Sequence, residues 1–122
     1  MFNVDVSGRI TLTRGDTASP PLFLNKGTDL KPLRHILQDG EEVYFAIMEP
    51  NQPFECAIVK KLLTKDNLNK NGDVVINIEH DDTRCLLPGK YFYQIKASIY
   101  NSETDKYEIN TVVQKTEFTL EE

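Results

Sequence analysis

The longest regular alternation in this chain, YFYQIKASIY, runs from residue 91 to residue 100. One row consists of Tyr91, Tyr93, Ile95, Ala97 and Ile99, and the other of Phe92, Gln94, Lys96, Ser98 and Tyr100. Successive side chains of a β-strand point to opposite faces of its sheet, so a period of two sets one apolar row against a core. The stretch therefore predicts a β-strand with one buried face.

Shorter alternating or β-branched segments recur along the chain at intervals of about ten residues. They are residues 2–6, 10–12, 20–24, 43–48, 56–63, 74–78 and 107–120. Asn71-Gly72 is the strongest short hairpin signal, and it predicts that segments 56–63 and 74–78 are the two arms of a hairpin. The segment 43–48 is apolar at nearly every position and predicts a strand buried on both faces.

Helix is expected only as single turns, one within 31–37 and one within the connection 80–89, which Pro88-Gly89 would end. Asp81 or Asp82 would cap the second turn. About eight short strands without a long helix predict an all-β fold, an antiparallel sandwich or barrel. The length and the absence of a linker or repeat predict one domain across residues 1–122.

Charge and hydropathy narrow the classes of partner. The chain carries 14 basic and 19 acidic residues, a net charge of −5, and neither sign is clustered. Nucleic-acid binding requires a concentrated basic face, so it is not expected. No run of 18 apolar residues occurs and MFNVDVSGRI lacks the features of a signal peptide, so no membrane span and synthesis in the cytoplasm are expected.

Catalytic and metal-binding chemistry has few candidates. Cys56 and Cys85 with His35 or His80 are the only nucleophile–base option. Their spacings match no zinc motif, and Cys56 falls in an expected strand as a small core residue. A strand-to-strand disulfide is geometrically possible, but without an export signal both thiols are expected to be reduced. The prediction is a non-enzymatic protein without cofactor or metal.

The most specific local pattern combines an acidic turn, an apolar plug, a glycine and two tyrosines. It comprises Asp82, Leu86 (or Leu87), Gly89, Tyr91 and Tyr93. In immunoglobulin-like sandwiches a tyrosine opens a strand at such a corner, and its hydroxyl bonds to the backbone a few residues upstream. The pattern predicts this arrangement, and therefore an immunoglobulin-like sandwich of about seven to nine strands, although the chain has no tryptophan as a core pin.

Arg14-Gly15-Asp16 is the tripeptide associated with integrin adhesion, but here it lies between two β-rich segments. Gly15 can supply a positive φ and Asp16 can bond to nearby amides, so the tripeptide predicts a turn and a structural role.

Aromatic residues on the second face of the expected strands are the candidate interface. Phe92 and Tyr100 oppose the row of Tyr91 and Tyr93, and Tyr44 opposes Phe45. If they are exposed, Tyr44, Phe92 and Tyr100 would mark a protein interface or a sugar-binding platform.

Four stretches occur here in a familiar order: ITLTRGDTASPPLFL, DGEEVYFAIMEP, IEHDDTRCLLPGKYFYQIKA and TVVQKTEFTLEE. This order resembles the small immunoglobulin-like domains of tail and baseplate proteins in phages and prophages of Gram-positive bacteria. It is similar in particular to the N-terminal domain of siphophage baseplate upper proteins. The matching positions are Arg14 to Thr17, Gly40 to Phe45 and Asp82 to Ile95.

The resemblance implies a virion-structural module that is made in the host cytoplasm and assembled into a tail or baseplate. It would act by docking to other tail proteins, and it allows a homo-oligomer. The chain lacks the helical and receptor-proximal parts of the baseplate protein, so a specific attachment role does not carry over. A carbohydrate- or surface-binding module is the alternative, and a small cysteine enzyme is a third hypothesis.

Overall fold

The computed structural model describes residues 2–22, 24 and 35–122. Its strands are β1 (Phe2–Val4), β2 (Ile10–Thr13), β3 (Pro21–Leu22), β4 (Glu42–Met48), β5 (Val59–Leu63), β6 (Val74–Val75), β7 (Gly89–Asn101) and β8 (Lys106–Glu121). Short helical turns are η1 (Phe54–Cys56), η2 (Lys65–Asn67) and α1 (His80–Thr83). The expected all-β character and the helical turn within 80–89 are confirmed, whereas most of 31–37 lies outside the described residues.

Two sheets contain these strands. The larger has the order β1-β2-β8-β7-β4-β5, and the smaller pairs β3 with β6. Every strand pair is antiparallel except β2 with β8, where Ile10 to Thr13 run parallel to Phe118 to Glu121. The prediction of a wholly antiparallel fold is therefore wrong at this one pair.

The predicted hairpin between segments 56–63 and 74–78 is also wrong. Segment 59–63 forms β5 and pairs with β4, while β6 pairs with β3. Asn71-Gly72 does form a turn, in which the Gly72 N–H donates to the Asn69 carbonyl at 3.0 Å. That turn closes only a single bridge between Leu68 and Val74.

Strand β7 follows the alternation from which it was predicted. Tyr91, Tyr93, Ile95 and Ala97 are all at most 8% exposed. Tyr93, Ile95 and Ala97 lie opposite the buried β4 residues Ile47, Phe45 and Val43, and Tyr91 lies opposite the buried Phe118 of β8. The rings of Phe45 and Tyr93 are 5.9 Å apart at their centroids. This row is the core face of the large sheet, and burial of such side chains contributes about 1.5–3 kcal/mol each.

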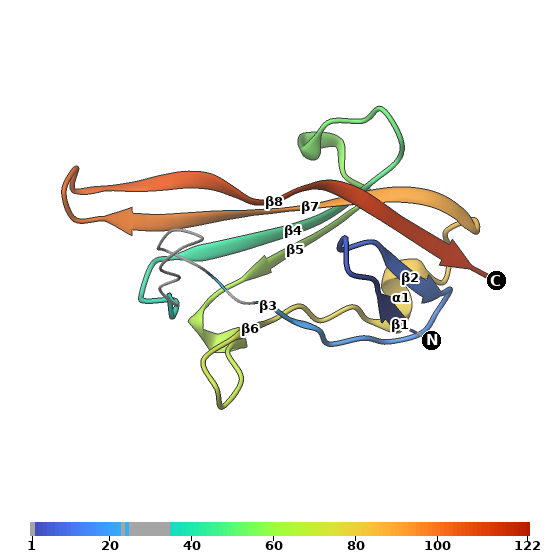
Figure 1. Cartoon of the computed structure of the whole chain (residues 1–122), viewed down its shortest axis with the longest axis horizontal. Helices are drawn as coiled ribbons and strands as arrows, with labels where there is room; N and C mark the ends of the chain where they lie inside the picture. Colours follow the sequence, from blue (N-terminus) through green and yellow to red (C-terminus); the bar gives the residue numbers. More distant parts are fainter. Residues whose placement is uncertain (1, 23, 25–34) are drawn as a thin grey trace.

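The two faces of the large sheet have different surroundings. Strands β3 and β6 and helix α1 lie on the core side (Figure 1). On the other side, here called the outer face, the loop of residues 49–58 arches over the strands (Figure 1). Strands β7 and β8 continue beyond the end of β4 as a two-stranded ribbon (Figure 1).

Candidate functional site

The corner that precedes β7 has the geometry of the tyrosine motif. The Tyr91 hydroxyl donates to the Leu87 carbonyl, four residues upstream, at 2.6 Å. Burial raises the pKa of this phenol above its usual value. Leu86 packs against the core, whereas Leu87 is 78% exposed, so Leu86 is the apolar plug. Gly89 begins β7 directly after this corner.

Removing the Tyr91 hydroxyl tests the importance of this contact. Tyr91→Phe is expected to lower the free energy of unfolding by about 1 kcal/mol, because one short hydrogen bond to a carbonyl is lost. Urea unfolding followed by circular dichroism measures the change. Tyr107→Phe is the matched control, since the Tyr107 hydroxyl is 3.5 Å from its acceptor and the residue is 52% exposed. Equal losses in both variants would contradict a specific role for the corner.

Tyr93 links β7 to the N-terminal hairpin. Its hydroxyl donates to the Gly8 carbonyl at 2.6 Å, across a sequence separation of 85 residues. Burial raises the pKa of Tyr93 as well. The hydroxyl groups of both tyrosines of the motif therefore connect β7 to backbone carbonyls of neighbouring segments.

Asp82 connects α1 to β5. Its Oδ2 atom accepts from the Glu79 backbone N–H at 2.7 Å and lies 2.8 Å from the Lys61 ammonium. Glu79 occupies the cap position of α1, so the expectation that Asp81 or Asp82 stands there is wrong. Asp82 instead lies in the first turn of α1, where its side chain accepts the hydrogen bond from the N–H of the cap residue.

The Arg-Gly-Asp turn is held against the same helix. The Asp16 N–H donates to the Thr13 carbonyl at 3.0 Å, which closes the turn, and Gly15 has a φ of +82°. The Gly15 N–H donates to Thr83 Oγ1 at 2.9 Å, and its carbonyl accepts from His80 Nδ1 at 2.7 Å. Both backbone groups of the central glycine are thus occupied by α1, which fixes the turn to the body of the domain.

The three candidate interface aromatics lie on the outer face. Tyr44 is opposite Lys96 in the β4–β7 register, and Phe92, Lys96 and Tyr100 share one side of β7 because β7 alternates regularly. All three aromatics are half-buried. The Tyr44 hydroxyl donates to Glu42 at 2.7 Å, and this bond leads the causes that raise the Tyr44 pKa. Tyr100 donates to Asp105 and packs against the Tyr107 ring.

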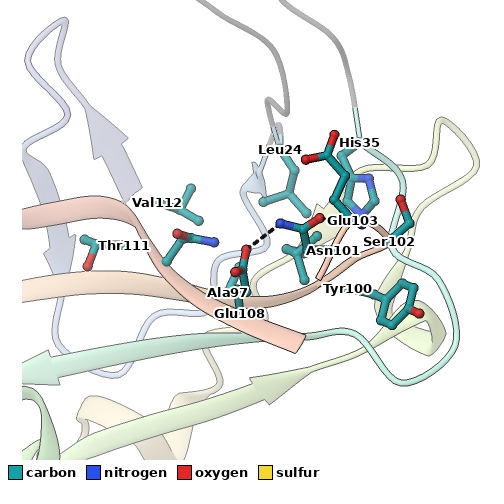
Figure 2. A pocket seen from close by; sticks show the side chains of 12 residues that line it. Leu24, His35, Ala97, Tyr100, Asn101, Ser102, Glu103, Glu108, Thr111 and Val112 are labelled. Atoms are coloured by element: carbon teal, nitrogen blue, oxygen red, sulfur yellow. Dashed lines mark hydrogen bonds between the residues drawn. The ribbon is translucent and has the colours of Figure 1, made fainter. Parts of the chain in front are cut away.

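A cavity of about 640 Å³ opens beside the β7–β8 ribbon on the core side (Figure 2). Among the described residues, Ile99 and Leu24 contribute apolar walls. Asn101 and Glu108 face the cavity and are joined by a hydrogen bond of 2.9 Å (Figure 2). His35 lies at its rim (Figure 2). Apolar walls with a few polar groups are the usual form of a small-molecule site, but among the described lining residues no nucleophile is hydrogen-bonded to a base.

A buried carboxylate next to this cavity, Glu41, was not among the residues expected to form a site. Glu41 is 2% exposed and accepts hydrogen bonds from three donors. They are His35 Nε2 at 2.8 Å, the Gln38 N–H at 2.8 Å and the Tyr100 N–H at 2.9 Å. Burial raises the pKa of Glu41, but these hydrogen bonds outweigh it and the net pKa is lowered. His35 therefore stabilises the base of the ribbon through its hydrogen bond to Glu41, and this contact does not activate a thiol.

The two cysteines lie away from the cavity. Cys56 is exposed in η1, so its expected place in a strand core is wrong, and Cys85 is exposed after α1. Both are free thiols in the structure.

Comparisons with protein-family models, curated proteins and solved structures all returned no match. Within residues 2–22, 24 and 35–122, no cluster of three or more potential metal-binding side chains occurs. The described helices are too short to cross a membrane.

Proposed function

We propose that this chain is a non-enzymatic structural module of a phage or prophage tail or baseplate, with an immunoglobulin-like sandwich as its fold. It docks to other tail proteins as part of the virion. The observation that carries the proposal is the tyrosine corner, in which the Tyr91 hydroxyl contacts the Leu87 carbonyl within the motif Asp82 to Ile95.

The strand arrangement supports the sandwich. Strands β5, β4, β7 and β8 are consecutive neighbours in one sheet, and β3 with β6 form a separate pair. In immunoglobulin-like domains the corner tyrosine lies near the start of a strand. This strand comes directly after the chain has crossed over from the other sheet. Tyr91 has this position, because β7 is the next strand after β6 and Tyr91 is its third residue.

The surface supports docking to proteins. Ile109 in the β7–β8 ribbon is 67% exposed and Leu62 in β5 is 57% exposed. Large apolar side chains on an open sheet face fit a protein partner better than a small ligand, which requires a concave site.

A particle experiment tests the tail function. Phage particles would be induced from a host that encodes this chain, purified by density gradient and analysed by mass spectrometry. We expect the protein to cosediment with tails in a fixed ratio to a tail-tube protein. A capsid-free tail fraction without the protein, while the protein stays free in the lysate, would reject the proposal.

A further inference from the structure

Part of the outer face lies open between the 49–58 loop and the ring pair of Tyr100 and Tyr107. At one end the 49–58 loop lies over the sheet as far as Lys96, a half-buried residue at the boundary of the open part, whose ammonium is 4.7 Å from the Phe54 ring centroid. At the other end the rings of Tyr100 and Tyr107 pack together with centroids 5.3 Å apart. The surface between them is here called the window.

Two rows of directly opposed residues form the window. One row joins Leu62, Tyr44 and Lys96 across β5, β4 and β7. The next row joins Glu42, Ser98 and Ile109 across β4, β7 and β8, and its small central residue, Ser98, is itself buried. Residues directly opposite in a sheet share a face, so Leu62 and Ile109 stand on the same surface as the predicted interface residue Tyr44. They are 57% and 67% exposed.

The charges of the window are self-complementary. Glu42 and Lys96 are its two charged residues, and they occupy adjacent rows on neighbouring strands. The window is therefore neutral, whereas the whole chain has a net charge of −5. Two copies of an acidic chain repel least through a neutral surface, and opposite charges on one surface match under two-fold symmetry.

The sheet edges are less suitable for pairing of two copies. Lys60 and Lys61 lie at the centre of edge strand β5, so antiparallel pairing of two β5 edges would set like charges together. Strand β8 extends well beyond its contact with β2, but its register against β7 shifts on both sides of Ile95. Such bulges disrupt pairing along an edge, so a face-to-face contact is favoured.

We propose that the window binds a second copy of this chain, giving a two-fold dimer in which the large sheets pack face to face. Lys96 of each copy lies near Glu42 of the other, and the exposed Leu62 and Ile109 side chains become buried. This pairing uses the same exposed Leu62 and Ile109 that support docking to tail proteins. Its test is made on the isolated chain, so its failure would leave the particle experiment to decide the tail function separately.

The size of the window predicts weak association. Four strands spaced about 4.8 Å apart give a face about 20 Å wide, which is at the small end for specific complexes. We therefore expect a dissociation constant above about 1 μM.

Sedimentation equilibrium of the purified full chain tests the dimer. The wild type should change from monomer to dimer between about 1 and 500 μM. Leu62→Asp and Ile109→Asp should each weaken dimerisation at least about tenfold, because each buries an unpaired charge. Val6→Asp is the matched control, since Val6 is fully exposed on the N-terminal hairpin and should leave dimerisation unchanged.

Charge variants test the two-fold contact itself. Lys96→Glu gives a window with two acidic residues, and Glu42→Lys gives one with two basic residues. Each variant alone should be monomeric, and an equimolar mixture should form a heterodimer at least as readily as the wild type. Thermal unfolding of each variant confirms that it is folded. A wild type that stays monomeric at about 500 μM, or folded variants that fail to associate on mixing, would overturn the proposal.

Discussion

Glu41→Ala is expected to lower the free energy of unfolding by about 3–5 kcal/mol. The Glu41 carboxylate is 2% exposed and accepts from His35, from the Gln38 N–H and from the Tyr100 N–H. Alanine leaves these three donors without an acceptor in a place that water does not reach freely. Because Tyr100 lies in β7, the loss should also loosen the base of the β7–β8 ribbon. Urea unfolding measures the free energy, and hydrogen exchange at the Tyr100 amide measures the local effect.

Glu41→Gln separates the effect of the side chain's shape on stability from the effect of its charge. Glutamine keeps an acceptor oxygen but carries no negative charge. The folded state lowers the pKa of Glu41 below its usual value of 4.5. The ionised group therefore adds stability above that value, and this contribution disappears as the pH falls through the lower pKa of the folded state. We expect the wild type to exceed Glu41→Gln in stability at pH 7 and to lose this advantage progressively below about pH 4.5. A difference that stays constant over this range would contradict the charge-based explanation.

Local periodicity explains which parts of the fold could be predicted. Strand β7 was visible because its buried and exposed rows alternate without interruption over ten residues of sequence, and the structure buries the expected row from Tyr91 to Ala97. The corner contact of Tyr91 was also predictable, because its donor and acceptor are four residues apart. Both features depend on short sequence distances.

Pairings over longer distances were not predictable in the same way. Asn71-Gly72 correctly marked a turn, but burial of the β4 core row decided that β5 pairs with β4. Cys56 was misplaced because a short apolar run does not distinguish a strand from the loop before it.

The Glu41 site depends on Tyr100, which is 59 residues away in the sequence. One signal could have revealed it. Glu41 lies two residues before Val43, in the same alternating row as Phe45 and Ile47, and therefore on the buried side.

Gly15→Val is expected to lower the free energy of unfolding by about 2–3 kcal/mol. Gly15 has a φ of +82°, a conformation that a β-branched residue adopts only with strain. A Cβ atom there would also lie 3.3 Å from both Cε1 and Nδ1 of His80. The imidazole would have to shift, which would weaken its hydrogen bond to the Gly15 carbonyl. Urea unfolding of the variant measures the cost, and Gly15→Ala should show a smaller loss because alanine is less bulky.

Arg14→Ala is the matched control within the same tripeptide. Its guanidinium is 2.8 Å from Glu122, but the Glu122 side chain is 72% exposed, so the pair should contribute less than about 1 kcal/mol. Stability should therefore depend strongly on Gly15 and weakly on Arg14, whereas an adhesion sequence would depend on Arg14 for binding and on neither for folding. A large loss of stability in Arg14→Ala, or none in Gly15→Val, would contradict a structural role for the turn. Side chains of α1 form hydrogen bonds with both the N–H and the carbonyl of Gly15. We therefore expect the tripeptide to stabilise the packing of β2 against α1.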